Sequence, residues 1–402
     1  MQKTHVFQEI KTWKRPFHRL YAKISSLYLK ILPNVEVIGI TGSVGKTLTQ
    51  NAIYSVLSQK FHTVVGNENL DPTFRIPKTI LKTKPWDQKL ILEYGVEHPE
   101  DMDYYLKIAK PKVAILTLIA PTHTKYFKNV QGVFEEKVKL VKVLPKNGYA
   151  ILNADDPFSY KAKNSILSST FWFGQRAKGG VKISHFTQNL KGSKFRLHYK
   201  GQMATVSWKI IGKHHLMSVY ISATLGIING LKLKQIATGL SKTKVPKHRL
   251  NLISRKNFTI IDDAYNSSPK ASEQSITTLV DLGKRKTKIA VLGEMKDLGT
   301  ISNSAHVALG QKIAKTKINY LITVGKKAEI IADSAKKTGF TRKIIKTQDS
   351  IKAIEAIKKL NLKGSIILVK GSRHAHLERI VLALLGKSTK INCYYCGELN
   401  RV

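Results

Sequence analysis

The stretch Val35-Glu-Val-Ile-Gly-Ile-Thr-Gly-Ser-Val-Gly-Lys-Thr47 decides how this chain folds. Its apolar first half predicts a buried β-strand over residues 35–40, followed by a glycine turn and a helix that opens at Lys46. The glycines at 42 and 45 let backbone N–H groups converge on an anion. A helix N-terminus directly behind such a turn adds a favourable dipole, so the stretch has the build of an anion-binding site.

The turn has the pattern Thr-Gly-x-x-Gly-Lys-Thr, a short form of the phosphate-binding loop in which Ile40 stands where the longer form has glycine. Lys46 can reach a terminal phosphate, and the Thr47 hydroxyl can bind the Mg²⁺ that accompanies it. The pattern therefore favours a nucleotide site over an ordinary strand–helix turn. The predicted nucleotide-binding residues are Gly42, Ser43, Val44, Gly45, Lys46 and Thr47.

Composition indicates a cytoplasmic globular protein. The 402 residues suggest two or three domains, and the apolar content of 42% with 23% charged residues is that of a soluble chain. There is no run of eighteen apolar residues and no evident signal peptide. The only cysteines, Cys393 and Cys396, fit a reducing compartment. They form either a loosely packed tail or half of an intermolecular zinc site or disulfide.

The charge balance is extreme, with 68 Lys and Arg against 26 Asp and Glu. Such an excess attracts anionic partners, including nucleotides, nucleic acid and acidic lipid. The lysines are scattered along the whole chain, and no nucleic-acid-binding motif accompanies them. We therefore expect no dedicated nucleic-acid binding.

Residues 1–34 are predicted to form a basic amphipathic helix from about Pro16 to Leu32, which Pro33 ends. No acidic residue lies between Glu9 and Glu36. Such a helix can pack its apolar stripe on the next domain, or it can make weak contact with an anionic membrane surface. The apolar residues at helical spacing are Trp13, Phe17, Leu20, Tyr21, Ile24, Leu27, Tyr28, Ile31 and Leu32.

Strands that alternate with helical stretches predict an α/β fold with parallel sheets. The first predicted sheet contains strands near residues 35–40, 61–65, 89–95 and 114–119, with helices over 132–143 and from Gly212 to about Leu240. A small antiparallel insert is predicted over 165–212. The second sheet, of Rossmann type, contains strands near 258–263, 288–293, 320–325 and 365–370. The expected domains are a helix over 1–34, a central ATP-binding domain over 35–243, a C-terminal domain over 244–390 and a tail over 391–402.

Glu93 and His123 follow two of the predicted strands. In parallel sheets, ligands gather beyond the carboxyl ends of the strands, which is also where the glycine turn lies. We therefore expect both side chains to face the nucleotide site.

Several motifs, taken in order, resemble those of the Mur ligase family, the ATP-dependent amide ligases of peptidoglycan precursor synthesis. The resemblance covers roughly residues 35 to 385. The motifs are Thr41-Gly-Ser-Val-Gly-Lys-Thr47, Glu93-Tyr-Gly95, His123, Lys137, Asn153-Ala-Asp-Asp-Pro157, Gly212-Lys-His214, Arg249, Asp262-Asp-Ala-Tyr-Asn-Ser-Ser-Pro269, Val291-Leu-Gly-Glu-Met-Lys-Asp-Leu-Gly299 with His306, and Lys370-Gly-Ser-Arg373.

The resemblance implies an enzyme that joins D-Ala-D-Ala to UDP-N-acetylmuramoyl-tripeptide through an acyl phosphate, with ATP and two Mg²⁺ ions. It implies that Lys46, Lys137 and His123 are catalytic. It further implies that Thr47 and Glu93 bind one metal, and that His123 and a carbamylated Lys137 bind the second. In the C-terminal domain, Arg249, Asp263 and Asn266 would hold the nucleotide, and closure of that domain would complete the site.

Three departures from the family pattern concern substrate recognition, and one of them is Leu118-Ile-Ala120, where an Asn-Ile-Gly is usual before the histidine. Only about 34 residues precede the first strand, where the family has a domain that binds uridine diphosphate. The family pattern Asn-x-Asn-Asn-x-x-Gly-x-Pro is replaced by Asn67-Glu-Asn69 followed by Leu-Asp-Pro-Thr-Phe-Arg-Ile-Pro77, which is longer and lacks the glycine. There are two alternatives. One is a Mur-like ligase for another carboxylate and amine, and the other is a non-catalytic nucleotide-binding protein at the membrane surface. We expect a monomer.

Overall fold

The computed structural model describes residues 15–66, 72–388, 391–392 and 399–400. The chain divides into two compact units. Unit 1 comprises Met1–Thr187, Ser193–Lys209 and His214–Pro246, and unit 2 comprises Gln188–Gly192, Ile210–Lys213 and Lys247–Val402. The main junction therefore follows Pro246.

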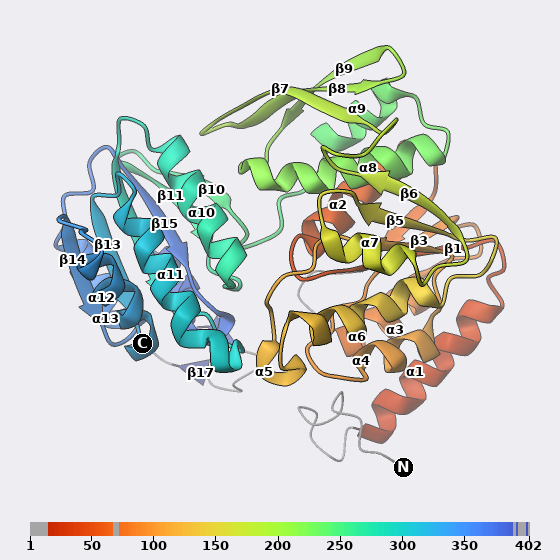
Figure 1. Ribbon diagram of the computed structural model, residues 1–402, viewed down its shortest axis with the longest axis horizontal. Helices are drawn as coiled ribbons and strands as arrows, with labels where there is room; N and C mark the ends of the chain where they lie inside the picture. Colours follow the sequence, from red (N-terminus) through yellow and green to blue (C-terminus); the bar gives the residue numbers. More distant parts are fainter. Residues whose placement is uncertain (1–14, 67–71, 389–390, 393–398, 401–402) are drawn as a thin grey trace. The chain divides into compact units, whose positions relative to one another are not determined.

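Unit 1 is built on a six-stranded parallel sheet in the order β2-β3-β1-β4-β5-β6 (Figure 1). Its strands are β1 (Glu36–Thr41), β2 (Thr63–Val65), β3 (Lys89–Glu93), β4 (Val113–Leu116), β5 (Tyr149–Asn153) and β6 (Ser169–Phe173). The central strands are buried along their whole length, as expected for a parallel sheet covered on both faces. Strand β1 lies between β3 and β4, so the connections on its two sides lead in opposite directions along the sheet. In open α/β sheets, ligands bind beyond the carboxyl end of a strand at such a position.

The helices of unit 1 pack on this sheet or on one another. They are α1 (Arg15–Lys30), α2 (Lys46–Leu57), α3 (Pro72–Lys82), α4 (Asp101–Ile108), α5 (Thr124–Phe127), α6 (Val130–Lys142), α7 (Pro157–Lys163), α8 (Leu216–Ile228) and α9 (Leu233–Ser241). Leu90 and Leu92 of β3 share a core with Ile76 of α3 and Leu140 of α6. The predicted helix at Lys46 is confirmed, and the predicted helix over 132–143 corresponds to α6.

The prediction of one helix from Gly212 to about Leu240 is wrong, because α8 and α9 are separate. Gly230 between them has a φ of 71°, a left-handed conformation that ends a helix and that glycine adopts without strain. The Asn229 side chain also accepts a hydrogen bond from Lys89 at 2.6 Å, which holds the break against the amino end of β3.

The antiparallel insert is smaller than predicted. It consists of β7 (Lys182–Asn189), β8 (Gly192–Tyr199) and β9 (Gln202–Trp208), which form a separate three-stranded sheet. Strand β6, which the predicted range 165–212 included, instead pairs in parallel with β5 and extends the main sheet. Its half-exposed alternation resembles that of an antiparallel strand because β6 lies at the sheet edge.

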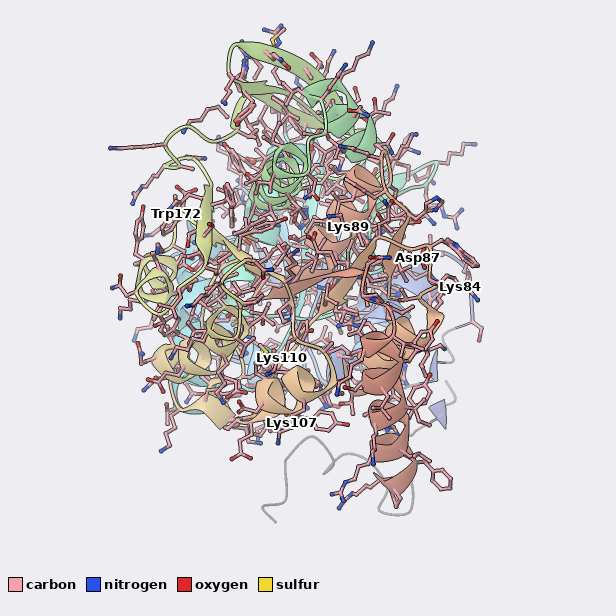
Figure 2. The ribbon with its side chains drawn as sticks, turned by 90° about the vertical axis from the view of Figure 1, so that its right-hand side faces the viewer. Lys84, Asp87, Lys89, Lys107, Lys110 and Trp172 are labelled. Atoms are coloured by element: carbon pink, nitrogen blue, oxygen red, sulfur yellow. The ribbon has the colours of Figure 1, made fainter. Side chains whose placement is uncertain are left out.

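Helix α1 packs on unit 1 through the face that carries small and polar residues. His18, Ala22 and Ser25 are its buried residues, and the His18 ring lies 3.7 Å from the Phe74 ring of α3, centroid to centroid. The Tyr28 hydroxyl donates to the Thr83 carbonyl at 2.7 Å. The turned view shows α1 in front of the sheet (Figure 2).

Unit 2 is a second three-layer α/β unit with a six-stranded sheet in the order β10-β11-β15-β12-β13-β14. Only β10 runs antiparallel in this sheet. The strands are β10 (Asn251–Ser254), β11 (Phe258–Asp263), β12 (Thr287–Gly293), β13 (Tyr320–Val324), β14 (Lys343–Thr347) and β15 (Ser365–Lys370). Its helices are α10 (Pro269–Leu282), α11 (Ser302–Ala314), α12 (Glu329–Lys337), α13 (Ser350–Lys358) and α14 (Glu378–Leu384).

Alternate residues of each strand in unit 2 enter two different cores. Ile261 points to the core with α10, α11 and α12, whereas Ile260 points to the core with α13 and α14. This period of two is what a sheet buried on both faces requires. The predicted α/β class is therefore confirmed for both sheets.

None of the helices within the described ranges is long and apolar enough to cross a bilayer. The short strands β16 (Ile391–Asn392) and β17 (Leu399–Asn400) pair near the end of the chain. Asn67-Glu-Asn69 and the Cys393/Cys396 pair lie outside the described residues.

The contact between α2 and α9 depends on a glycine. A Cβ atom on Gly239 of α9 would lie 2.6 Å from the Ser55 carbonyl oxygen and from the Val56 Cα of α2. We predict that Gly239→Ala lowers the free energy of unfolding by about 1–3 kcal/mol, because backbone rather than a flexible side chain must move. Urea denaturation measures this, with Gly180→Ala as the control, where the nearest atom to the added Cβ is 3.3 Å away. Equal effects of the two substitutions would contradict the prediction.

Candidate active site

The glycine turn lies at the carboxyl end of β1 and is tied to the segment that leaves β4. The Ser43 N–H donates to the Leu118 carbonyl at 2.8 Å, and the Ser43 hydroxyl donates to the Ala120 carbonyl at 2.8 Å. The Ala120 N–H donates back to the Ser43 hydroxyl oxygen at 3.0 Å, and the Thr117 hydroxyl donates to the Val44 carbonyl at 2.8 Å. The turn is therefore held rigidly before any ligand arrives.

Both glycines of the turn adopt backbone conformations that other residues avoid. Gly42 has a φ of 145° and Gly45 a φ of 81°. A Cβ on Gly42 would lie 2.0 Å from the Thr117 hydroxyl oxygen. Each glycine is thus required by the fold of the turn itself.

Thr47 and Glu93 come together as the sequence analysis expected. The Thr47 hydroxyl donates to Glu93 Oε2 at 3.0 Å, and both side chains are buried. Lys46 Nζ donates to the Gly42 carbonyl at 2.9 Å, which places its charge at the turn.

Arg75 also reaches Glu93, and sequence reasoning missed it. One terminal nitrogen of its guanidinium lies 3.4 Å from Glu93 Oε2, and the other donates to the Glu93 backbone carbonyl at 3.4 Å. Both side chains are only 6% exposed, so this is a buried ion pair. Arg75 stands two residues before Pro77, where the family pattern has glycine, and that substitution was the only signal in the sequence.

Lys137 is buried on α6, with 1% of its surface exposed. Burial holds the pKa of its amine well below the usual range, and the neighbouring positive charge of Lys46 lowers this pKa further. Among the nearby carboxylates, Asp101 accepts hydrogen bonds from the N–H groups of Glu97 and His98. Burial raises the pKa of Asp101 to about 6. The structure thus keeps the Lys137 amine in a setting that disfavours its protonated form.

His123 caps α5 and has a left-handed backbone, with a φ of 52°. Its carbonyl accepts hydrogen bonds from Tyr126 at 2.9 Å and Phe127 at 3.1 Å, which stabilise this conformation. It follows β4 closely, as expected, in the same segment that contacts the glycine turn. A non-glycine residue held in this conformation fits a functional position.

Two residues of the Asn153-Ala-Asp-Asp-Pro157 motif form hydrogen bonds with the segment that directly follows β4. The Asn153 amide donates to the Thr117 carbonyl at 2.9 Å, and Asp156 Oδ2 accepts from the Ile119 N–H at 3.1 Å. The motif therefore positions the segment that leads to His123.

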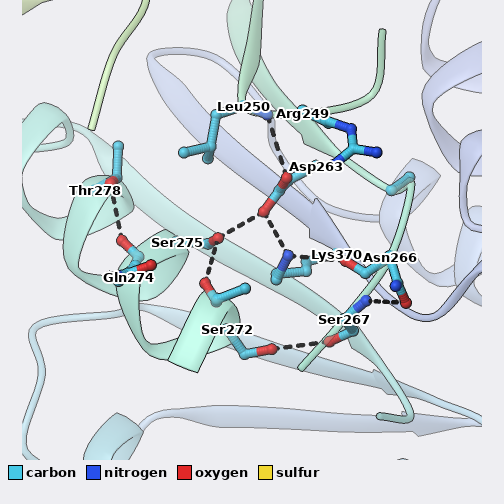
Figure 3. Close-up of polar contacts among 12 residues, drawn as sticks. Arg249, Leu250, Asp263, Asn266, Ser267, Ser272, Gln274, Ser275, Thr278 and Lys370 are labelled. Atoms are coloured by element: carbon cyan, nitrogen blue, oxygen red, sulfur yellow. Dashed lines mark hydrogen bonds and ion pairs between the residues drawn. The ribbon is translucent and has the colours of Figure 1, made fainter. Parts of the chain in front are cut away.

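In unit 2, Asp263 lies at the centre of a buried polar cluster (Figure 3). Its Oδ2 accepts from Lys370 Nζ and from the Ser275 hydroxyl, both at 2.6 Å, and its Oδ1 accepts from the Leu250 N–H at 3.2 Å. Lys370 Nζ also donates to the Asn266 carbonyl at 3.0 Å. Asp263 thus joins the ends of β11 and β15, and Lys370 fixes the backbone at Asn266.

Arg249 lies over the ring of Tyr265, 4.1 Å from its centroid, and Arg373 lies 5.0 Å from the same centroid. Two cations around one aromatic ring form a positive patch within unit 2. Arg249, Asp263 and Asn266 are therefore neighbours, as the sequence analysis expected, although the Asp263 carboxylate is bound within the unit.

His306 has a positioning role in the same unit. Its Nε2 accepts from the Met295 N–H at 3.0 Å, and its Nδ1 lies 2.6 Å from the Ser302 carbonyl, to which it donates. The residue is fully buried, and burial lowers its pKa, so it is a neutral link between α11 and the loop after β12.

The donor set of unit 1 suits a hard divalent cation. A threonine hydroxyl and a carboxylate 3.0 Å apart are the oxygen ligands that Mg²⁺ prefers. Within the described residues, no group of three or more His, Cys, Asp or Glu side chains could hold a metal. Of the four predicted metal ligands, Glu93 and His123 belong to those residue types, whereas Thr47 and Lys137 do not. The predicted set therefore could not have formed such a group.

Comparison with known proteins agrees with this geometry. The family model described as Mur ligase middle domain matches residues 40–226, and the model described as Mur ligase, glutamate ligase domain matches residues 248–373. The chain belongs to the Mur ligase family.

Several of its similar relatives are named for one reaction. UDP-N-acetylmuramoyl-tripeptide–D-alanyl-D-alanine ligase of Buchnera aphidicola is 31% identical over 90% of this chain and 78% of the relative. The ligase of the same name from Bacillus subtilis is 29% identical over the same shares. The MurF ligase of Thermotoga maritima, solved in complex with ADP, is 26% identical, with a TM-score of 0.78, 90% of this chain covered and 82% of that one. MurF of Acinetobacter baumannii, at 24% identity and a TM-score of 0.84 over 92% and 81%, shares the fold.

The ion pair between His248 and Asp262 makes unit 2 sensitive to pH. His248 Nδ1 lies 2.7 Å from Asp262 Oδ2, and this hydrogen bond raises the pKa of His248 above 6.5. Protonated His248 therefore stabilises the fold below that pH, and the contribution is lost as pH rises through the folded-state pKa.

We predict that His248→Asn is less stable than the wild type at pH 5.5 and that the difference narrows at pH 9. Asparagine tolerates the φ of 56° at this position. Thermal melts at both pH values measure the effect, and His62→Asn, at an exposed histidine, is the control. A pH-independent difference would show that the ion pair contributes nothing.

Proposed function

We propose that this protein is an ATP-dependent ligase that joins D-Ala-D-Ala to UDP-N-acetylmuramoyl-tripeptide in peptidoglycan precursor synthesis. The observation that carries the proposal is the phosphate-binding turn with the Thr47–Glu93 pair beside it and the buried Lys137 within range of the Lys46 charge. The relatives of high coverage are named for this reaction.

The chain would supply positioning and charge neutralisation for phosphoryl transfer, which needs little covalent help from protein. The N–H groups of the turn and Lys46 would hold the terminal phosphates of ATP. The substrate carboxylate would become an acyl phosphate, which the amine of D-Ala-D-Ala attacks, forming the amide and releasing phosphate. The rigid attachment of the turn through Ser43 favours this role, because donors fixed in advance stabilise charge without reorganisation.

Mg²⁺, when bound, would neutralise charge on the phosphates and on the substrate carboxylate. Thr47 and Glu93 would hold one ion. His123 and Lys137 would hold a second, with Lys137 carrying a carbamate that turns its cation into an anion. A buried amine that is disfavoured as a cation is suited to that modification, because only the neutral amine reacts with carbon dioxide. In unit 2, Arg249, Asn266 and the Asp263 cluster would contact the nucleotide.

A second candidate is a Mur-type ligase that acts on another carboxylate and amine pair. Arg75 favours it, because a buried guanidinium replaces the family's glycine next to Glu93. Both candidates share the ATP chemistry, and under both the protein would act in the cytoplasm as a monomer.

Release of ADP tests the choice. The full chain with ATP and Mg²⁺ is expected to release ADP only when both UDP-N-acetylmuramoyl-tripeptide and D-Ala-D-Ala are present. ADP release that requires another amine would favour the second candidate. ADP release without any amine or carboxylate substrate would contradict ligase function.

Lys46→Ala is predicted to lower the rate of ligation by at least about 10³-fold, since it removes the cation nearest the transferring phosphoryl group. Turnover of ADP formation measures this. Lys178→Ala, which removes an exposed lysine elsewhere in unit 1, is the control. Near-normal turnover of the Lys46 variant would remove the glycine turn from the mechanism.

Lys137→Ala is predicted to be severely impaired and to regain part of its activity when a short-chain carboxylate such as acetate is added, because the carboxylate can take the place of the carbamate. Lys142→Ala, at an exposed lysine of the same helix, should be unaffected with or without acetate. Full activity of the Lys137 variant without acetate would show that the amine serves only the fold.

A further inference from the structure

Helix α1 presents a continuous apolar stripe to solvent. Phe17, Leu20, Ile24 and Leu27 follow one another at intervals of three and four residues, and Ile31 continues the line just past the helix end. Their exposed fractions are 67%, 56%, 47%, 53% and 71%, respectively. Isolated exposed apolar residues are ordinary, but five in one line are not.

The stripe is not the face through which α1 packs on the protein, because the opposite face of the same helix makes those contacts. His18, Ala22 and Ser25 point inward, and Tyr28 and Ser26 donate hydrogen bonds to the carbonyls of Thr83 and Lys107. These contacts fix the rotation of the helix about its axis. The outward direction of the stripe is therefore set by the structure, and the stripe forms a ridge rather than a groove.

Positive charge lies on both sides of the stripe. Exposed Arg19, Lys23 and Lys30 lie along one side of α1, and the helix contains no acidic residue. Lys107, whose carbonyl receives the Ser26 bond, is beyond that side, and Lys84 follows Thr83 on the other. Figure 2 shows Lys107 and Lys110 on one side of α1 and Lys84 on the other.

An exposed tryptophan lies near the residues that follow α1. Trp86 is 66% exposed in the turn after α3, where the Lys84 N–H donates to Asp87 Oδ2 at 2.6 Å. A hollow of about 530 Å³ joins this turn to Pro33 and Asn34 after α1. Trp86 therefore borders the same hollow as the residues that follow α1 and Ile31. An exposed indole is typical of proteins at a membrane interface.

We propose that the stripe of α1, with its flanking cations and Trp86, is a docking surface for an anionic lipid bilayer. The apolar side chains enter the boundary between headgroups and acyl chains, and the cations contact acidic headgroups. A bilayer fits a convex ridge because it is a continuous surface. A second copy of the chain fits less well, because pairing two stripes brings the basic sides of both helices together.

The test is co-sedimentation of the full chain with vesicles of phosphatidylcholine, with and without about one third phosphatidylglycerol. The wild type is expected to sediment with the anionic vesicles only, and to lose binding in about 1 M salt, where the Debye length falls to about 3 Å. The triple variant Leu20→Gln, Ile24→Gln, Leu27→Gln should bind roughly tenfold less. Its melting temperature should not change, because these side chains are exposed.

Two further variants keep the test decisive. Arg19→Gln, Lys23→Gln, Lys30→Gln removes three charges beside the stripe and should also weaken binding, whereas Lys178→Gln, Lys191→Gln, Lys194→Gln removes three exposed charges elsewhere and should not. Equal losses in these two charge variants would assign binding to net charge and overturn the proposal. So would a wild type that does not bind, or a wild-type dimer that the stripe variant converts to monomer.

Discussion

The hydrogen bonds between the glycine turn and the segment after β4 are the constraint on which the rest of unit 1 depends. Ser43 both donates to and accepts from residue Ala120, and Thr117 donates to Val44. This attachment joins the ends of β1 and β4, which are neighbours in the sheet although β2 and β3 lie between them in the sequence. It fixes the start of α2, and with it Lys46 and Thr47, relative to the segment that carries His123. The glycine turn and His123, which are distant in sequence, are thereby made parts of one structure.

The main features of unit 1 were predictable because they depend on local chemistry. A run of apolar residues followed by Gly-x-x-Gly-Lys-Thr has few folds other than strand, anion-binding turn and helix, and β1 and α2 lie where this pattern placed them. Glu93 and His123 were predicted to face one site because strand ends of a parallel sheet share an edge, and the structure joins Glu93 to Thr47 of α2. The break between α8 and α9 was missed, because a single Gly230 in an apolar stretch is compatible with a continuing helix until its φ is known.

The contacts that the sequence did not reveal join residues far apart in the chain. Lys370 lies 107 residues from Asp263, and the sequence around either residue does not indicate that the two form an ion pair. In the sequence, Arg75 stood out only because it replaces the glycine of the family pattern. Its ion pair with Glu93 could not be predicted without knowing that α3 packs against β3. The side of α1 that faces outward was equally hidden. The apolar stripe was evident, but the structure buries the small residues opposite to it.

The burial of so many carboxylates has a consequence for how this protein responds to ionic strength. Asp263, Asp262, Glu93 and Asp101 are among the acidic residues that lie inside the units, bound to internal partners. The surface is therefore more uniformly cationic than the ratio of 68 basic to 26 acidic residues implies. Salt screens repulsion between exposed lysines but hardly reaches buried ion pairs. We therefore expect added salt to weaken the repulsion between like surface charges while leaving the buried ion pairs intact. The fold should then gain stability in salt, whereas a protein stabilised by surface ion pairs would lose it.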